Sequence, residues 1–245
     1  MGHPPAQTRL ADPEIGRDLR DRLPTRAGQI HCSTPELRRL GCRHPRLPSR
    51  DDHRLGPGVR RSGSGSWLAH RDSGFRDSRL ELGGELSGKT LQLSVGDLRQ
   101  LPKTEYIAVH TCMQGWSATS KWAGVRLRDL LEVLGPPPEG ANYVMITSHG
   151  LAQEMWDHRP REPFYAVLDL DTVAEDDTIL AYERNGHPLE VHLGAPLRLR
   201  VESNHGYKMV KWIKSIEWIT DYAAYGDGRG GTREDAAMQA FNGRI

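Results

Sequence analysis

Cys112 is one of three cysteines in the chain, and its surroundings allow three kinds of chemistry. It stands in HTCMQGWSATSKWAGVRLRDLL, residues 110–131, directly after the apolar run EYIAVH. A lone cysteine is most often a small buried apolar residue. On a strand, His110 and Cys112 share a face, so a Cys–His nucleophilic pair is a second interpretation. The third is ligation of a metal that already carries sulfur from an organic cofactor, because a thiolate is a soft ligand.

Basic residues further along the chain suit the third interpretation. An organic cofactor that carries a phosphate group needs Arg or Lys beside it. The chain supplies Arg198, then Lys208 and Lys211. The sequence has no P-loop, and no G-x-G-x-x-G loop that stands between a predicted strand and a predicted helix, so nicotinamide and nucleotide cofactors lose their usual support.

Composition excludes several classes of partner. The formal net charge of the 245 residues is +1, which favours neither nucleic acid nor an anionic membrane. No apolar run approaches the roughly 18 residues of a membrane span, and no export segment is readable near the N-terminus. Three cysteines are too few for a disulfide framework. We therefore expect a cytoplasmic protein with a small-molecule substrate, or a periplasmic one if the N-terminus is not native.

The chain divides into two parts of different composition. Residues 1–79 hold 16 arginines, no lysine and 9 acidic residues, and they are rich in Pro, Gly and Ser. Such a composition buries too little apolar surface to fold, so we expect residues 1–78 to be disordered or non-native, as when DNA is translated in the wrong frame. A basic nucleic-acid tail is one alternative. Another is a zinc site, although its short cysteine spacing is missing; its candidates are His31, Cys32, Cys42, His44 and His53.

Residues 79–245 have the patterns of one folded domain with a short C-terminal extension. Short strands are predicted near residues 80–82, 91–95, 105–110, 142–150, 195–203 and 208–220, with a hairpin at 179–191. A helical turn is predicted at 94–101 and a helix at 125–134. Short strands with one or two helices predict an α+β fold.

Four sequence elements, in order, carry a resemblance to a known family. They are the cysteine followed by Gly-Trp-Ser, the NG-x-PL turn, GAP-L-R-L and GYK-x-VKW-I, all between residues 79 and 225. Together they resemble the molybdopterin-binding domain of the sulfite oxidase family of oxidoreductases. The tail GRGGTRED is similar to that of a bacterial branch of the family. The resemblance implies the sulfite-oxidase-type fold and a molybdenum–molybdopterin cofactor.

The resemblance also implies roles for individual residues. Cys112 matches the sole protein ligand of the molybdenum, and so the catalytic cysteine. A second set of residues matches the family positions that hold the pterin and its phosphate: Thr147 or Ser148, His192, Arg198, Met209, Val210 and Lys211. The choice between Thr147 and Ser148 stays open. Without the resemblance, Arg198 would be taken as the exposed face of a strand. Three tryptophans are expected to be core residues: Trp116, Trp122 and Trp212.

The implied activity is two-electron oxygen-atom transfer on a small oxyanion or an S- or N-oxide, with an unidentified electron-transfer partner. Two features of the family are missing: an Arg-x-His element before residue 79 and a tyrosine after Tyr225. A cofactor-binding domain without catalysis therefore stays an alternative. An enzyme similar to protein-methionine-sulfoxide reductases is another, and a Cys–His hydrolase is a third.

Overall fold

The computed structural model describes residues 7–9, 65–111, 117–151, 162–237, 240–241 and 243–244. The strands are β1 (Gln7–Arg9), β2 (Leu80–Gly83), β3 (Thr90–Leu93), β4 (Lys103–Thr111), β5 (Ser117–Arg126), β6 (Tyr143–Leu151), β7 (Pro163–Asp169), β8 (Ile179–Arg184), β9 (His187–Pro188), β10 (Arg198–Arg200) and β11 (Ile213–Ile219). The helices are α3 (Gly65–Asp72), α4 (Val95–Leu98), α5 (Leu127–Glu132), α6 (Leu170–Ala174) and α7 (Thr232–Asp235), and the 3-10 turns are η2 (Val191–Leu193) and η3 (Gly206–Lys208).

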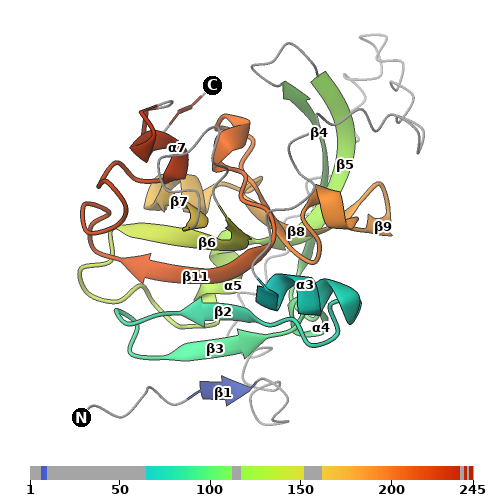
Figure 1. Cartoon of the computed structure of the whole chain (residues 1–245), viewed down its shortest axis with the longest axis horizontal. Coiled ribbons are helices and arrows are strands. Elements are labelled where there is room, and N and C mark those ends of the chain that lie inside the picture. Colours follow the sequence, from blue (N-terminus) through green and yellow to red (C-terminus); the bar gives the residue numbers. More distant parts are fainter. Residues whose placement is uncertain are drawn as a thin grey trace.

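Two mixed-order sheets form the body of the domain (Figure 1). The larger has the strand order β1-β3-β2-β11-β6-β7, and the smaller has the order β10-β8-β5-β4, with β9 paired to β8. The β1–β3 and β2–β11 pairs are parallel, and the remaining pairs are antiparallel. Short helices connect the strands, which confirms the α+β prediction.

The main apolar core lies between the two sheets. Leu82 of β2 and Ile146 of β6 come from the larger sheet, and Leu180 of β8 and Leu199 of β10 come from the smaller. Helix α5 closes this core with leucines at helical spacing, as the sequence pattern predicts: Leu127, Leu130, Leu131 and Leu134. Buried apolar area of this kind supplies most of the driving force for folding.

The face of the smaller sheet turned away from this core is also covered. A second apolar cluster there contains Trp122 of β5 and Ile179 and Ala181 of β8. Tyr106 and Ala108 of β4 pack against it. Because side chains alternate along a strand, the neighbours of the core residues point to this second face. The second face is where the candidate site lies.

The C-terminal residues pack beside β7, where Figure 1 shows α7. Gly231 forms an isolated antiparallel bridge with Ala166 of β7. Helix α3 precedes the predicted domain start at residue 79, and the ring of His70 on this helix lies 5.6 Å from that of His149 on β6. None of the helices in the described part of the chain has the length and apolar character that a membrane crossing needs.

Candidate cofactor site

Strand β10 presents two arginines to the second face of the smaller sheet. Leu199 lies in the main core, so Arg198 and Arg200 on either side of it point the other way. Their guanidinium carbons lie 4.9 and 4.5 Å from the centroid of the Trp122 ring. A third guanidinium, that of Arg184, lies 5.7 Å from the same ring. Three cations therefore share one indole, an arrangement that cation–π attraction supports.

Arg198 and Arg200 differ in how their charge is compensated. Nε and Nη2 of Arg200 each donate to a carboxylate oxygen of Glu202 at 2.8 Å, as a two-bond fork. Arg198 is only 8% exposed, and its Nη1 donates to the neutral carbonyl of Leu193 at 3.0 Å. Its Nε has no hydrogen-bond partner among the described residues. Arg198 is therefore a buried cation with a spare donor, which costs free energy unless an anion binds it.

Lys211 lies beside Arg198. The two residues form an isolated antiparallel bridge between β10 and the segment before β11. Nζ of Lys211 donates to the carbonyl of His192 at 3.0 Å, and the Lys211 carbonyl accepts from Oγ of Ser148 at 2.6 Å. Four of the residues implied by the resemblance, from β6, η2, β10 and the segment before β11, are thus joined: Ser148, His192, Arg198 and Lys211.

Burial and mutual repulsion of the basic side chains favour negative charge in this cluster. Burial, and next the charge of Arg200, lower the pKa of Arg198 to about 9. Burial, and next Arg198, lower the pKa of Lys211 to about 8. The pKa of His110 on β4 is also lowered, by burial first and then by Arg200 and Arg198. Like charges held together disfavour one another, and an anion placed among them relieves the repulsion.

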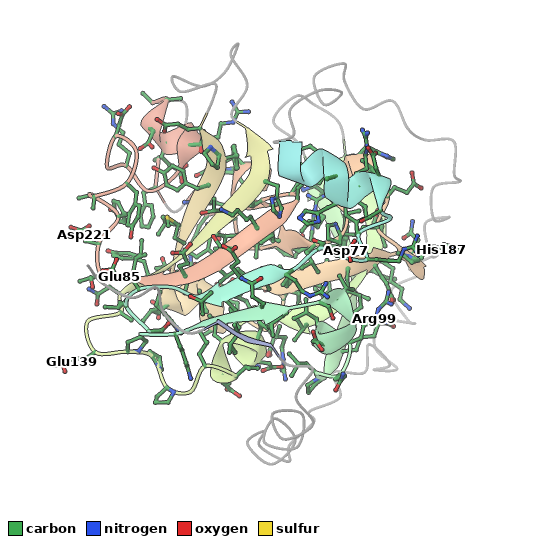
Figure 2. The ribbon with its side chains drawn as sticks, turned by 60° about the horizontal axis from the view of Figure 1, so that its bottom comes forward. Asp77, Glu85, Arg99, Glu139, His187 and Asp221 are labelled. Carbon is green, nitrogen blue, oxygen red and sulfur yellow. The ribbon has the colours of Figure 1, made fainter. Side chains whose placement is uncertain are left out.

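Several charged residues elsewhere in the fold lie at its periphery. Figure 2 shows Arg99, Glu139 and His187 near the outer edge of the fold, where water solvates charge. The buried cations of the candidate site depart from this rule, since ionised side chains are seldom fully buried without a partner. Their burial needs a functional explanation.

The low pKa of Lys211 has a consequence for the cofactor-free protein. Lys211 keeps its proton to about pH 8 in the folded state, against its ordinary value of 10.5 when unfolded. Between these pH values the unfolded state binds more protons, so stability rises as the pH rises. We expect Lys211→Met to remove roughly 1–3 kcal/mol of that rise. Urea unfolding of both proteins on either side of pH 8 measures it, and identical pH slopes would contradict the assignment.

Trp212 belongs to this site and is only partly buried, so the expectation that it is a core residue is wrong, whereas Trp122 is buried as expected. Trp116 lies outside the described residues. Its backbone is left-handed, with φ of 54°. Its Nε1 donates to the carbonyl of Val191 at 2.7 Å. Its ring lies so close to Gly150 that a Cβ there would be 2.7 Å from the ring. Trp212 therefore joins η2 to the end of β6, in a backbone conformation that residues other than glycine seldom adopt.

The other implied residues have different surroundings. Cys112 lies outside the described residues, but the flanking strands pair up to Thr111 and Ser117. Thr147 sits in the ladder of the larger sheet, opposite Tyr165 and Ser215. Met209 and Val210 are buried, and their amides donate to the carbonyls of Gly206 and Lys208 at 3.1 and 2.9 Å, respectively. The imidazole of His192 lies 3.4 Å from the carboxylate of Glu190, while its carbonyl faces Lys211.

The described residues hold no cluster of three His, Cys, Asp or Glu that would bind a metal ion. The alternative zinc site near His31 and Cys32 lies outside them.

A family model described as the oxidoreductase molybdopterin binding domain matches residues 70–225. The chain belongs to this family. The resemblance to sulfite oxidases is confirmed, and molybdenum–molybdopterin is the cofactor it implies.

Proteins similar to this chain include both protein-methionine-sulfoxide reductases and sulfite oxidases. A putative protein-methionine-sulfoxide reductase subunit YedZ1 of Azospira oryzae is 28% identical over 67% of this chain and 55% of its own length. The catalytic subunit MsrP of the protein-methionine-sulfoxide reductase of Xanthomonas axonopodis pv. citri is 33% identical over 57% and 44%. The mitochondrial sulfite oxidase of Drosophila melanogaster is 30% identical over 57% and 27%. The chain thus spans about half or less of the length of these relatives.

The described residues of this molybdopterin-binding domain fit the phosphate of the cofactor. A phosphate monoester offers negative charge and several acceptor oxygens, which an arginine and a lysine side by side bind through charge-assisted hydrogen bonds. Arg198 has the unpartnered Nε, and Lys211 has an ammonium bonded to a neutral carbonyl. Sequence reasoning missed the supporting residues Trp122 and Arg200, although the alternation in LRLR signalled a second arginine on the same face.

Proposed function

We propose that the chain is a molybdenum-dependent oxidoreductase that transfers an oxygen atom and two electrons between the metal and a small sulfoxide or oxyanion. The observation that carries the proposal is the buried Arg198 with its unpartnered Nε, beside Lys211, in a chain of the molybdopterin-binding family. A domain without an anionic cofactor would gain nothing from keeping a buried arginine beside a partly buried lysine that repels it.

The residues have distinct roles in this proposal. Cys112 ligates the molybdenum, and Arg198 and Lys211 bind the pterin phosphate. Ser148 and the His192 carbonyl hold Lys211 from two sides, through bonds of 2.6 and 3.0 Å. The remaining implied contacts to the pterin come from Thr147, Met209 and Val210. When bound, the molybdenum supplies the two-electron chemistry, while the protein supplies position and charge.

Sulfoxide reduction is the first substrate class to test. Two of the three relatives above are a reductase, or a putative reductase subunit, of protein methionine sulfoxide. The overall reaction consumes one sulfoxide, two electrons and two protons, and it yields one thioether and water. An electron-transfer protein must supply the electrons. Sulfite oxidation is the second candidate, because the Drosophila relative is a sulfite oxidase.

The test begins with the full chain produced in a host that makes the cofactor. We expect stoichiometric molybdenum by elemental analysis, and turnover of a methionine-sulfoxide peptide with a reduced viologen dye. Protein without molybdenum would contradict the proposal and leave the Cys–His hydrolase. Molybdenum without turnover of the sulfoxide, or of sulfite with ferricyanide, would instead favour the cofactor-binding domain without catalysis.

A further inference from the structure

Lys208 is a buried lysine that the proposed cofactor site does not use. It ends η3, three residues before Lys211, and its side chain is 0% exposed. Nζ donates to the carbonyls of Val167 at 2.9 Å and Gly230 at 3.3 Å, and it forms an ion pair with Glu234. Glu234 is only 2% exposed. A fully buried ion pair costs desolvation free energy, so it is not explained by stability alone.

The partner of Lys208 belongs to the C-terminal segment, by which we mean the described residues from Gly226 to Arg244. This segment lies alongside β7, where the Val167 amide donates to the Gly230 carbonyl at 3.1 Å. Further along, the Gly243 carbonyl accepts from the His205 amide at 2.9 Å, and Arg244 forms a bridge with Asn204. The segment therefore touches both β7 and the residues around η3.

The residues from Asn204 to Lys211, which we call the phosphate loop, are fixed at two ends. At the base, Ser148 holds the Lys211 carbonyl, and the Leu199 amide donates to the Val210 carbonyl at 2.8 Å. At the tip, the C-terminal segment binds His205 and Lys208. The Val210 amide donates to the Lys208 carbonyl at 2.9 Å, so the position of Lys208 is passed directly to the residue beside Lys211.

We propose that Lys208 and Glu234 are positioning residues: their buried ion pair ties the C-terminal segment to the phosphate loop and thereby sets how firmly the cofactor phosphate is held. The inference rests on the proposed function of Arg198 and Lys211. An ion pair suits this task better than apolar contact because it fixes both partners at one geometry. The two carbonyls that accept from Nζ narrow that geometry further.

Replacing one carboxylate separates this role from general packing. Glu234→Gln leaves the Lys208 ammonium buried without its counter-charge. Asp235→Asn is the matched control, because Asp235 is an adjacent buried carboxylate whose partners lie outside the phosphate loop. They are the Tyr165 hydroxyl and the Arg229 amide. Both changes disturb the C-terminal segment, but only the first touches Lys208.

Two measurements on the full chain decide the matter. In the cofactor-loaded protein, Glu234→Gln should release molybdenum about tenfold faster than wild type, which corresponds to about 1.4 kcal/mol. In the cofactor-free protein, hydrogen exchange at the amides of residues 205–210 should also become about tenfold faster. Asp235→Asn should change neither the rate of molybdenum release nor the hydrogen-exchange rates of residues 205–210. The double change Lys208→Met with Glu234→Leu should restore the melting temperature without restoring retention.

Exchange in the cofactor-free protein tests the inference even if the proposed function fails. If the wild-type protein bound no molybdenum, only the proposed function would be contradicted, because the hydrogen-exchange rates of the phosphate loop could still be measured. The positioning role would be overturned if the exchange rates of residues 205–210 were equal in Glu234→Gln and wild type. It would also be overturned if Glu234→Gln and Asp235→Asn changed these exchange rates equally.

Discussion

Cys112→Ser should abolish oxygen-atom transfer while leaving the protein folded and able to bind the pterin. The exchange replaces a soft thiolate by a hard, poorly ionised hydroxyl at nearly the same volume, so the metal loses its ligand but the chain gains no clash. The phosphate anchor that we propose at Arg198 and Lys211 belongs to other parts of the chain, so pterin binding should survive. Turnover with an artificial electron donor and the visible absorption of the oxidised protein both report the change.

The strand before Cys112 explains why this position suits a ligand. Strand β4 is paired residue by residue with β5 as far as Thr111 and Ser117, so its end is fixed by the ladder. The glycine at 115 would let the backbone approach the pterin, because glycine tolerates angles that a side chain forbids. Cys32→Ser and Cys42→Ser are the controls and should alter neither activity nor spectrum. Normal turnover with an unchanged spectrum in Cys112→Ser would make the thiol a packing residue only.

The alternating strands could be predicted because one face of each is apolar. Leu197, Leu199 and Val201 all lie in the main core, as their spacing predicts. Alternation does not say what covers the opposite face. Arg198 lies there buried among β5, β8 and η2 rather than exposed, and those contacts come from residues far away in sequence. The sequence offered Arg198 as one of three basic candidates for a phosphate, and the family resemblance favoured it before the structure did.

Strands β5 and β7 had no readable alternation, for two different reasons. Ala166, Val167 and Leu168 of β7 are all buried, since one face meets the main core and the other meets Tyr143 and Phe241 among others, so no polar period appears. In β5 the pattern is interrupted by a register shift between Ala123 and Gly124. A Cβ at position 124 would lie 2.1 Å from the Leu180 carbonyl oxygen, so only glycine fits there.

The Lys208–Glu234 pair could not be predicted from local pattern at all. Lys208 stands in GYK beside the residues that we propose bind the phosphate, and from the sequence it looks like a third cation for the phosphate. The structure instead turns its ammonium toward Val167, Gly230 and Glu234. The short C-terminal extension predicted from the sequence thus supplies the counter-charge. Pairings between distant segments depend on the fold and leave no period in the sequence.

Arg198→Met should weaken cofactor retention about ten- to a hundredfold, because each charge-assisted bond to the phosphate contributes roughly 1.5–3 kcal/mol. The same change should not destabilise the cofactor-free protein, and below about pH 9 it should stabilise it. The reason is the sign of the pKa shift. Burial lowers the pKa of Arg198 from its ordinary value to about 9, so its charge opposes folding at neutral pH. Methionine removes that charge and keeps most of the apolar stem.

Arg200→Met is the matched control for Arg198→Met, because both residues belong to β10 and both guanidinium groups pack over the Trp122 ring. Arg200 is bound by Glu202, so its loss should destabilise the fold through an unpaired carboxylate, with a smaller effect on cofactor release at equal folded fraction. Molybdenum retained after gel filtration and urea unfolding of the cofactor-free proteins measure the two effects separately. If Arg198→Met kept its cofactor as wild type does, or unfolded more easily than Arg200→Met, Arg198 would serve the fold and not the phosphate.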